Sequence, residues 1–355
     1  MRKALYIVLI LLIAGGYCHY SVIGNNLVIA EQGSFAAGGK ILTHDGTYDK
    51  ANPYRPDGQT LRGDHAYAFY QKPLHARKYP LVFAHGIGQF SKTWETTPDG
   101  RDGFQNIFLK NRFAVYLVDQ PRRGRAGRSL ESATIKPDFS EQLWFNRFRI
   151  GVWPDYFDGV QFPKDEASLN QFLRQQTPTI GKQDLNVYAD GYAAVLEKSG
   201  PAILVTHSQG GPVGWLTAMK SDNVRAIVSY EPGGSFPFVK KENPTTEKAE
   251  SGQGETIEVS ETEVMKFTRY PIVIYYGDYL GDGSPETPKE QTQWYKRLQI
   301  ARKWAKAINS RGGDVTVVHL PEAGLHGNTH FPMSDLNNAE VADLLLKWLH
   351  EKDLD

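Results

Sequence analysis

The sequence lacks the features that define several classes of protein. Its 355 residues include a single cysteine, Cys18, so the chain can form no intrachain disulfide. Charge of neither sign is in excess, because 40 basic residues balance 40 acidic ones, which argues against a nucleic-acid-binding protein. There is no internal repeat of about 20 to 50 residues, and no cluster of ligands at the spacing of a metal site. We therefore expect a small-molecule partner, with neither a metal ion nor an organic cofactor.

The amino terminus has the layout of a secretory signal. Two basic residues precede an apolar stretch at 4–14, and a pair of glycines follows it. The apolar stretch is short for a membrane span, which takes about 20 residues. We predict that residues 1–20 are a signal peptide or N-terminal anchor, and that residues 21–355 form one exported domain. That domain would be periplasmic, secreted or anchored to a membrane through the N-terminal segment.

Short apolar runs alternate with helical patterns over most of the remaining chain. Runs that are apolar on both faces are typical of a parallel sheet covered by helices. The predicted strands span residues 81–84, 114–118, 202–206, 224–229, 271–276 and 315–320. Helical periodicity marks residues 184–198, 210–220, 286–310 and 339–350. This alternation predicts an α/β fold with a doubly wound, mostly parallel sheet.

Three regions depart from the alternation. Residues 27–30 and 40–43 flank a glycine-rich turn, and residues 66–71 alternate as a half-buried strand does, which predicts an N-terminal antiparallel hairpin or an edge region of the sheet. Residues 137–181 are rich in aromatic side chains and are predicted either to form an inserted cap over the sheet edge or to fill core. The polar stretch 240–263 is predicted to be a surface loop.

A serine stands between a predicted strand and a predicted helix. Ser208 follows the strand at 202–206 and is succeeded by Gln209, Gly210 and Gly211. At such a turn the hydroxyl projects out of the sheet, and the helix amino terminus favours developing negative charge. The glycines remove side chains that would clash there. Ser208 is therefore the predicted nucleophile, with a serine that only caps the helix as the alternative.

An acyl-transfer site also needs hydrogen-bond donors for the oxyanion. The residue after the nucleophile supplies one backbone N–H, which predicts Gln209. The second is expected from the glycine-containing loop after the strand at 81–84, and we predict that Ile87 or Gly88 provides it.

The base and its carboxylate are expected late in the chain. His326 and His330 lie between the last predicted strand and the last predicted helix, where a histidine can reach across the strand ends. Glu231, Asp278 and Asp282 follow the two strands that come after the nucleophile. Each choice gives the chain order Ser, acid, His. The pattern alone leaves both the acid and the base open.

Four stretches resemble bacterial and fungal α/β-hydrolase esterases that carry the triad acid after the sixth strand. They are residues 33–39, 85–101, 118–125 and 327–338, and they extend the resemblance over almost all of the chain after the N-terminal segment. The resemblance implies the α/β-hydrolase fold and a triad of Ser208, Glu231 and His330, because the Gly-Asn-x-His motif of the family falls on residues 327–330. Residues 120–127 depart from the usual pattern of the family.

The expected function is carboxylic ester hydrolysis through an acyl-enzyme intermediate, on a small-molecule ester. The alternatives are an acyltransferase, a hydrolase of another acyl or carbon–carbon bond on the same fold, and a non-catalytic binding protein. The aromatic content of residues 137–181 favours an apolar or aromatic ester. Neither the physiological ester nor the oligomeric state follows from the sequence, and a homodimer is one option.

Overall fold

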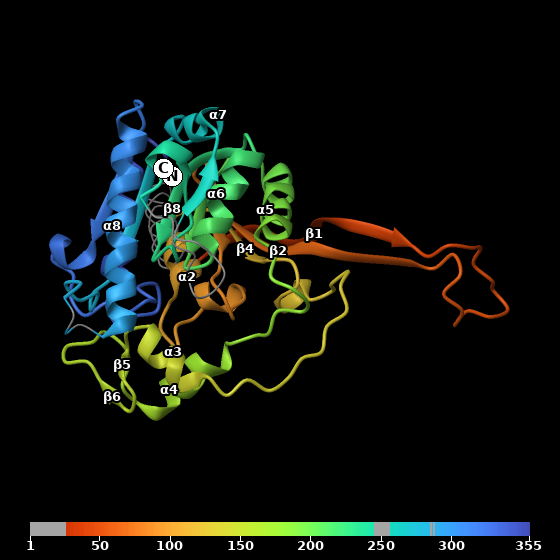
Figure 1. Cartoon of the computed structure of the whole chain (residues 1–355), viewed down its shortest axis with the longest axis horizontal. Coiled ribbons are helices and arrows are strands. Elements are labelled where there is room, and N and C mark those ends of the chain that lie inside the picture. The colour runs from red at the N-terminus through yellow and green to blue at the C-terminus, as the bar shows by residue number, and fades with distance from the viewer. Residues whose placement is uncertain (1–25, 245–255, 285, 287) are drawn as a thin grey trace, which may run out of the picture.

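The computed structural model describes residues 26–244, 256–284, 286 and 288–355, and an eight-stranded sheet forms its centre (Figure 1). The strands, in spatial order, are β1 (Ile29–Thr43), β2 (Thr60–Pro73), β4 (Val115–Asp119), β3 (Leu81–Ala84), β7 (Ala202–His207), β8 (Val224–Tyr230), β11 (Ile272–Tyr276) and β12 (Val315–His319). The pairs β1–β2 and β2–β4 are antiparallel, and every later pair in this order is parallel. The segment 1–20, with Cys18, lies outside the described residues.

Helices cover both faces of the sheet. They are α2 (Phe104–Lys110), α5 (Leu185–Ser199), α6 (Gly210–Lys220), α8 (Lys289–Asn309) and α9 (Asn338–Glu351). Successive side chains of a strand point to opposite faces, so Leu204 of β7 packs in one cluster with α5, α6 and α8. Its neighbours Ile203 and Val205 pack in another cluster with α2 and α9. Burial on both faces explains why the central parallel strands, such as β7 and β8, are largely apolar.

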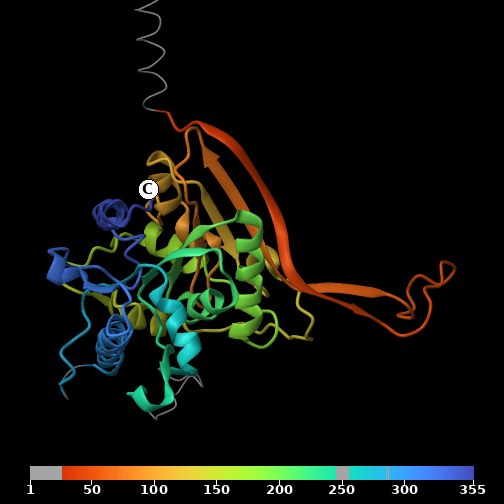
Figure 2. The same ribbon diagram turned by 90° about the horizontal axis from the view of Figure 1, so that it is seen from above.

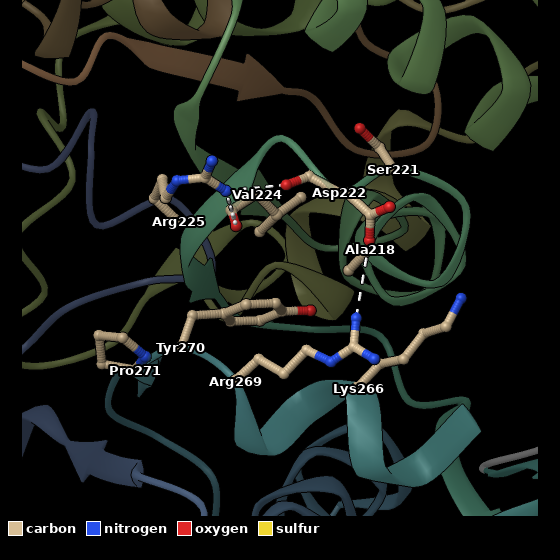
Figure 3. A pocket seen from close by; sticks show the side chains of 9 residues that line it. All are labelled: Ala218, Ser221, Asp222, Val224, Arg225, Lys266, Arg269, Tyr270 and Pro271. Atoms are coloured by element: carbon tan, nitrogen blue, oxygen red, sulfur yellow. Dashed lines mark hydrogen bonds and ion pairs between the residues drawn. The ribbon is translucent and has the colours of Figure 1, made fainter. Parts of the chain in front are cut away.

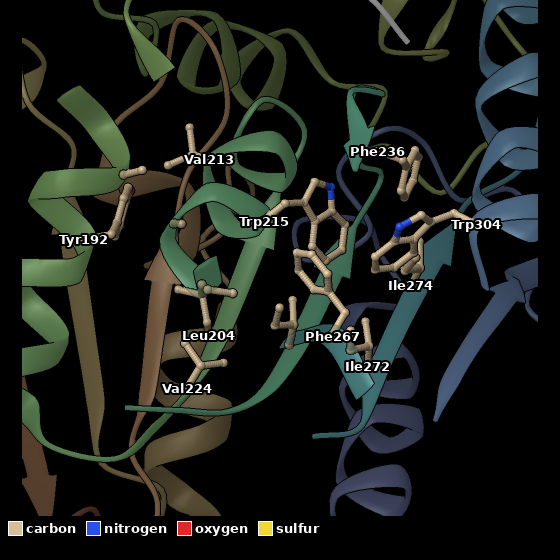
Figure 4. Packing of buried hydrophobic residues seen from close by; sticks show 14 of the residues in the cluster. Tyr192, Leu204, Val213, Trp215, Val224, Phe236, Phe267, Ile272, Ile274 and Trp304 are labelled. Atoms are coloured by element: carbon tan, nitrogen blue, oxygen red, sulfur yellow. The ribbon is translucent and has the colours of Figure 1, made fainter. Parts of the chain in front are cut away.

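Two tryptophans join α6 and α8 on the face of the sheet to which Leu204 points. Trp215 of α6 and Trp304 of α8 point toward each other, with ring centroids 4.9 Å apart, above Ile272 and Ile274 of β11 (Figure 4). Both rings also contact Phe267, so a continuous aromatic cluster fixes these helices on the sheet.

The predicted strands of the parallel sheet are all present, with ends displaced by at most one residue. The four predicted helices are also present, and the largest difference is that α8 begins at Lys289 and not at residue 286. The doubly wound, mostly parallel sheet with an antiparallel N-terminal pair is therefore as predicted.

The prediction of a glycine-rich turn near the amino terminus was wrong. Gly38 and Gly39 lie inside one continuous strand, β1, which pairs along its length with β2. Both glycines have positive φ, and a Cβ on Gly39 would come within 2.5 Å of the Gly63 carbonyl oxygen. The glycines thus let β1 bend and approach β2 closely. The resulting β1–β2 ribbon projects away from the helices (Figures 1 and 2).

Residues 137–181 follow β4 and contain α3 (Glu141–Arg147), α4 (Glu166–Arg174) and a small hairpin of β5 (Gly151–Val152) and β6 (Asp155–Tyr156). Several of their aromatic residues, among them Phe148 and Phe172, belong to the same buried cluster as Tyr230 of β8. We call residues 137–181 the inserted segment.

The polar stretch 240–263 is not loop throughout. Residues 245–255 lie outside the described residues, but β10 (Thr256–Val259) pairs in parallel with β9 (Phe236–Val239), and α7 (Glu261–Val264) follows. A capping box at Ser260 and Glu263 starts α7, a local signal that the polar composition concealed.

Candidate active site

Ser208 occupies the sharp turn between β7 and α6. Its φ of 54° lies in the left-handed region that residues with a Cβ seldom adopt. Backbone bonds hold this conformation, since Ser208 N donates to Tyr230 O at 3.0 Å and Ser208 O accepts from Gly211 N at 2.9 Å. A Cβ on Gly86 would come within 2.9 Å of the Ser208 Cβ, so glycine is needed beside the serine. Ser208 as a whole residue is 6% exposed.

Glu231 directly follows β8, the strand next to β7, and is fully buried. One carboxylate oxygen, Oε2, lies 3.3 Å from Nδ1 of His330. The other, Oε1, accepts hydrogen bonds from Gly277 N and from Nη2 of Arg149, the latter at 2.6 Å. Burial raises the pKa of Glu231, but the Arg149 charge and the bond from His330 outweigh it and lower that pKa to about 2. The carboxylate is therefore ionised.

His330 lies on the loop after β12 and is 1% exposed. Its backbone N donates to Phe148 O at 2.9 Å, and its ring stacks on the Phe148 ring with 9° between the planes. The Trp294 ring lies 4.3 Å away, centroid to centroid. Burial lowers the pKa of His330 to about 4, although Glu231 opposes that shift. A neutral ring facing an ionised carboxylate donates from Nδ1, which leaves Nε2 able to accept a proton.

His207 connects the turn at Ser208 to the loop that carries His330. His207, directly before Ser208, bonds through Nε2 to His330 O at 2.8 Å, and the two rings lie 4.7 Å apart. Among the described residues the Ser208 hydroxyl makes no hydrogen bond to His330. Such pairs are often longer in ligand-free enzymes and tighten with substrate.

The alternative acids and base lie elsewhere. His326 has a side chain 72% exposed and lies 4.0 Å from the Asp278 carboxylate. Asp278 accepts from Gly327 N at 2.8 Å and from Tyr279 N at 2.7 Å, so it shapes the loop that precedes His330. Asp282 is exposed and accepts from Ser284 N. The structure thus places Glu231 in contact with His330, and Ser208 directly follows the neighbouring strand, whereas His326 lies near Asp278 instead.

The predicted oxyanion loop lies against Ser208. In the described part of the chain, the backbone N–H groups of Ile87, Gly88 and Gln209 make no hydrogen bond, so all three candidate donors are available. The fully buried Arg123 donates to Gly86 O at 2.8 Å, and Gly88 O accepts from Thr177 N of the inserted segment. The carbonyl groups of Gly86 and Gly88 are therefore fixed by hydrogen bonds, while the N–H groups of Ile87 and Gly88 remain free to donate to a ligand.

Sequence reasoning missed Arg149 and Trp294. Arg149 is fully buried in the inserted segment and bonds to Glu231, while Trp294 of α8 contacts the His330 ring. The signal available for Arg149 was a charged residue set between two large apolar ones, Phe148 and Ile150. That pattern does not reveal which carboxylate the arginine meets.

A surface hollow of about 350 Å³ lies at the opposite edge of the sheet. It is bordered by the end of α6 and the starts of β8 and β11, and its lining includes Arg225, Arg269 and Tyr270 (Figure 3). It contains none of the predicted site residues.

Two further properties concern only the residues that the structure describes. They hold no group of three or more His, Cys, Asp and Glu side chains placed to bind a metal ion. They also include no helix that is both long enough and apolar enough to cross a membrane.

Known proteins resemble this chain in sequence and structure. Residues 81–254 match the model of a family described as the alpha/beta hydrolase family. A solved structure described as a novel bacterial esterase is 29% identical and superposes with a TM-score of 0.74, covering 92% of this chain and 98% of that one. A probable secreted lipase of Fungal sp. (strain ATCC 74256) is 29% identical over 304 residues, 77% of this chain and 82% of that protein.

Proposed function

We propose that this chain, which has the α/β-hydrolase fold and resembles a bacterial esterase and a secreted lipase, hydrolyses small carboxylic esters through a Ser208–His330–Glu231 triad. The observation that carries the proposal is the contact between the buried Glu231 carboxylate and His330 Nδ1, at the same sheet edge as the strained Ser208. A nucleophile, a base and an orienting carboxylate at one edge are what acyl transfer to serine requires.

In the proposed reaction, Ser208 Oγ attacks the ester carbonyl while His330 Nε2 takes its proton. The N–H of Gln209 and that of Ile87 or Gly88 bind the oxyanion, and Glu231 stabilises the imidazolium. His330 then returns the proton to the leaving alcohol, which produces an acyl-enzyme. In the second half of the reaction, water attacks this ester and gives a proton to His330, which passes it to the departing Ser208 Oγ, so that the acid is released and both side chains return to their starting state.

The surroundings of the triad favour an apolar substrate. The His330 ring is contacted by Phe148, Trp294 and Phe331, all of them aromatic. We therefore propose an ester with an apolar or aryl group on at least one side. A comparison of short-chain, long-chain and aryl esters tests this preference, and equal rates across the series would contradict it.

Export is part of the proposal. The charged, apolar and small-residue order of residues 1–20 supports it, and so does the similarity to a relative described as a secreted lipase.

The direct test is hydrolysis of p-nitrophenyl butyrate by the purified chain and by Ser208→Ala. We expect the substitution to lower kcat by about four to six orders of magnitude, because it removes the nucleophile. Labelling by a fluorophosphonate, located by mass spectrometry, should fall on Ser208 in the wild type. A Ser208→Ala variant that keeps the wild-type rate would exclude the proposed site.

A matched pair of carboxylate variants identifies the acid. Glu231→Gln should lower kcat by about 10⁴-fold, because the amide cannot stabilise the imidazolium. Asp278→Asn should lose far less, since Asp278 bonds to backbone N–H groups and not to His330. The reverse order would name Asp278 as the acid. Product analysis with an added alcohol acceptor separates hydrolysis from acyl transfer.

A further inference from the structure

Arg149 connects the inserted segment to the acid of the proposed triad. It follows α3 with a φ of 59°, and its side chain is fully buried. Nη2 donates to Glu231 Oε1 at 2.6 Å, and Nε donates to Asp278 O at 2.8 Å. The guanidinium also lies over the Trp294 ring, 5.0 Å from its centroid. One side chain thus joins the inserted segment, the ends of β8 and β11, and α8.

The two oxygens of Glu231 have separate partners. Oε1 faces Arg149 and Gly277 N, while Oε2 faces His330. A buried carboxylate without a cation is costly, and it regains stability by binding a proton or by keeping a neighbouring imidazole protonated. Either outcome would deprive Ser208 of its base. A permanent cation on the far oxygen removes both routes, because arginine does not release its proton.

We propose that Arg149 is a positioning residue for the reaction: the inserted segment supplies a guanidinium that keeps Glu231 ionised and directed at His330, so that the imidazole stays neutral and available as a base in acidic solution. This inference rests on the proposed triad. It gives the inserted segment a role in assembling the site, in addition to any role in covering it.

Other charged and titratable groups surround the Glu231–His330 pair. His207, directly before Ser208, faces the His330 ring, and burial lowers the pKa of His207 well below its usual value. The guanidinium of Arg297, also on α8, lies over the same Trp294 ring as Arg149, 4.4 Å from its centroid. Asp278 and Asp335 bond to the backbone and side chains of the loop that carries His330. Of all these groups, Arg149 alone bonds to the Glu231 carboxylate through a side-chain cation among the described residues.

The charge of Arg149 sets the direction in which its loss would shift the pH dependence of the reaction. The Arg149 charge lowers the pKa of Glu231 and also that of His330. Loss of that charge therefore raises the pKa of Glu231 and that of His330, so these two residues hold a proton up to a higher pH. The acid limb of kcat/KM, which lies near pH 4 in the wild type if His330 governs it, must then move upward.

The test compares Arg149→Met, Arg149→Lys and the control Arg147→Met in p-nitrophenyl butyrate hydrolysis across the pH range. Arg147 lies two residues away in the inserted segment and is half-buried, with its guanidinium over the Trp144 ring. We expect Arg149→Met to move the acid limb upward by roughly one pH unit and to lower the plateau kcat by about 10 to 100-fold, with little change in KM. Arg149→Lys should keep the wild-type limb with a reduced kcat, and Arg147→Met should match the wild type.

An unmoved acid limb in Arg149→Met, whatever its plateau, would overturn the inference, because a merely structural role lowers the rate without shifting the limb. If Arg149→Met does not fold, Arg149→Lys decides: a displaced limb, or an unchanged kcat, contradicts the proposal. A titration of ¹³C-labelled His330 by NMR, assigned with His330→Gln, reads the same shift without turnover. Absence of Ser208-dependent hydrolysis would refute the proposed function, whereas an unshifted His330 titration in the variants would refute only the role of Arg149.

Discussion

Two residues of the proposed triad have the same unusual backbone conformation. Ser208 and Glu231 follow neighbouring parallel strands, with φ values of 54° and 52°. Each is held by a backbone bond to the next strand, from Ser208 N to Tyr230 O and from Glu231 N to Tyr275 O. Conformations of this kind cost about 1 to 3 kcal/mol each in residues with a Cβ. The sheet maintains them, and they direct both side chains out of its carboxyl edge.

The cost at Ser208 can be measured. Glycine adopts positive φ without a steric penalty, and the Ser208 hydroxyl makes no hydrogen bond among the described residues. We expect Ser208→Gly to raise the free energy of unfolding by about 1 kcal/mol relative to Ser208→Ala, while both variants lose hydrolysis equally. Urea unfolding provides the measurement. Equal stabilities of the two variants would show that the elbow is not strained.

The choice of acid shows where sequence reasoning stops at the residue scale. Glu231 and Asp278 both follow parallel strands, so both reach the same sheet edge and both precede the histidine. The structure separates them through side-chain direction, since Glu231 meets His330 and Asp278 meets Gly327 N. That difference depends on the path of the loop after β12, which no local pattern encodes.

At the scale of elements, the inserted segment is bonded to both halves of the site. Phe148 O accepts from His330 N, and Thr177 N donates to Gly88 O on the oxyanion loop. Gln161 N donates to Gly327 O, three residues before His330. The segment therefore supports the base and the oxyanion loop at the same time. A shift of the segment would displace both.

A glycine on the histidine loop tests this coupling. Gly327 and Gly324 both have positive φ, but a Cβ on Gly327 would meet Gly159 O of the inserted segment at 2.1 Å, while a Cβ on Gly324 would meet nothing within 4 Å. We expect Gly327→Ala to lower kcat by about 10 to 100-fold, since an error of about 1 Å in placing a group costs that much. Gly324→Ala carries the same conformational strain and should stay within about threefold of the wild type. An equal loss of kcat in the two variants would mean that backbone strain, and not contact with the inserted segment, causes the loss.

Elements with a local cause were predictable and those with a tertiary cause were not. The strand β7 and the helix α6 were predicted almost to the residue, because burial on both faces and helical periodicity are written in their own sequences. The long strand β1 was missed because Gly38 and Gly39 look like a turn, whereas their neighbours in space are Ala194 and His65. The role of Arg149 was missed because its partner, Glu231, is also distant in the sequence and close only in space.

At the scale of the whole molecule, the parallel sheet gathers residues that lie far apart in the chain. Gly86, Ser208, Glu231 and Asp278 each follow a different strand, and the carboxyl ends of parallel strands share one edge. The fold could therefore be predicted together with the location of the site. The surface hollow beside Tyr270 lies at the other edge and plays no part in the proposed reaction.

The buried histidines set how the whole molecule responds to acid. Burial lowers the pKa of His85 and of His330 to about 4, and that of His207 well below the ordinary value of 6.5. Each remains neutral in the folded protein between pH 6.5 and 4 but binds a proton on unfolding, so stability falls as pH decreases through that window. Asp335 opposes this change, because burial raises its pKa to about 7 and it holds a proton that the unfolded chain releases.

Three histidines bind a proton on unfolding and Asp335 releases one, so about two protons net are taken up between pH 6 and pH 5. We expect the free energy of unfolding to fall by about 2 to 3 kcal/mol over that unit, as urea unfolding at the two pH values would measure. Asp335→Asn removes the opposing group, so its decrease should be steeper by about 1 kcal/mol even if the variant is less stable throughout. A stability that does not change between pH 6 and 5 would contradict neutral burial of the three histidines.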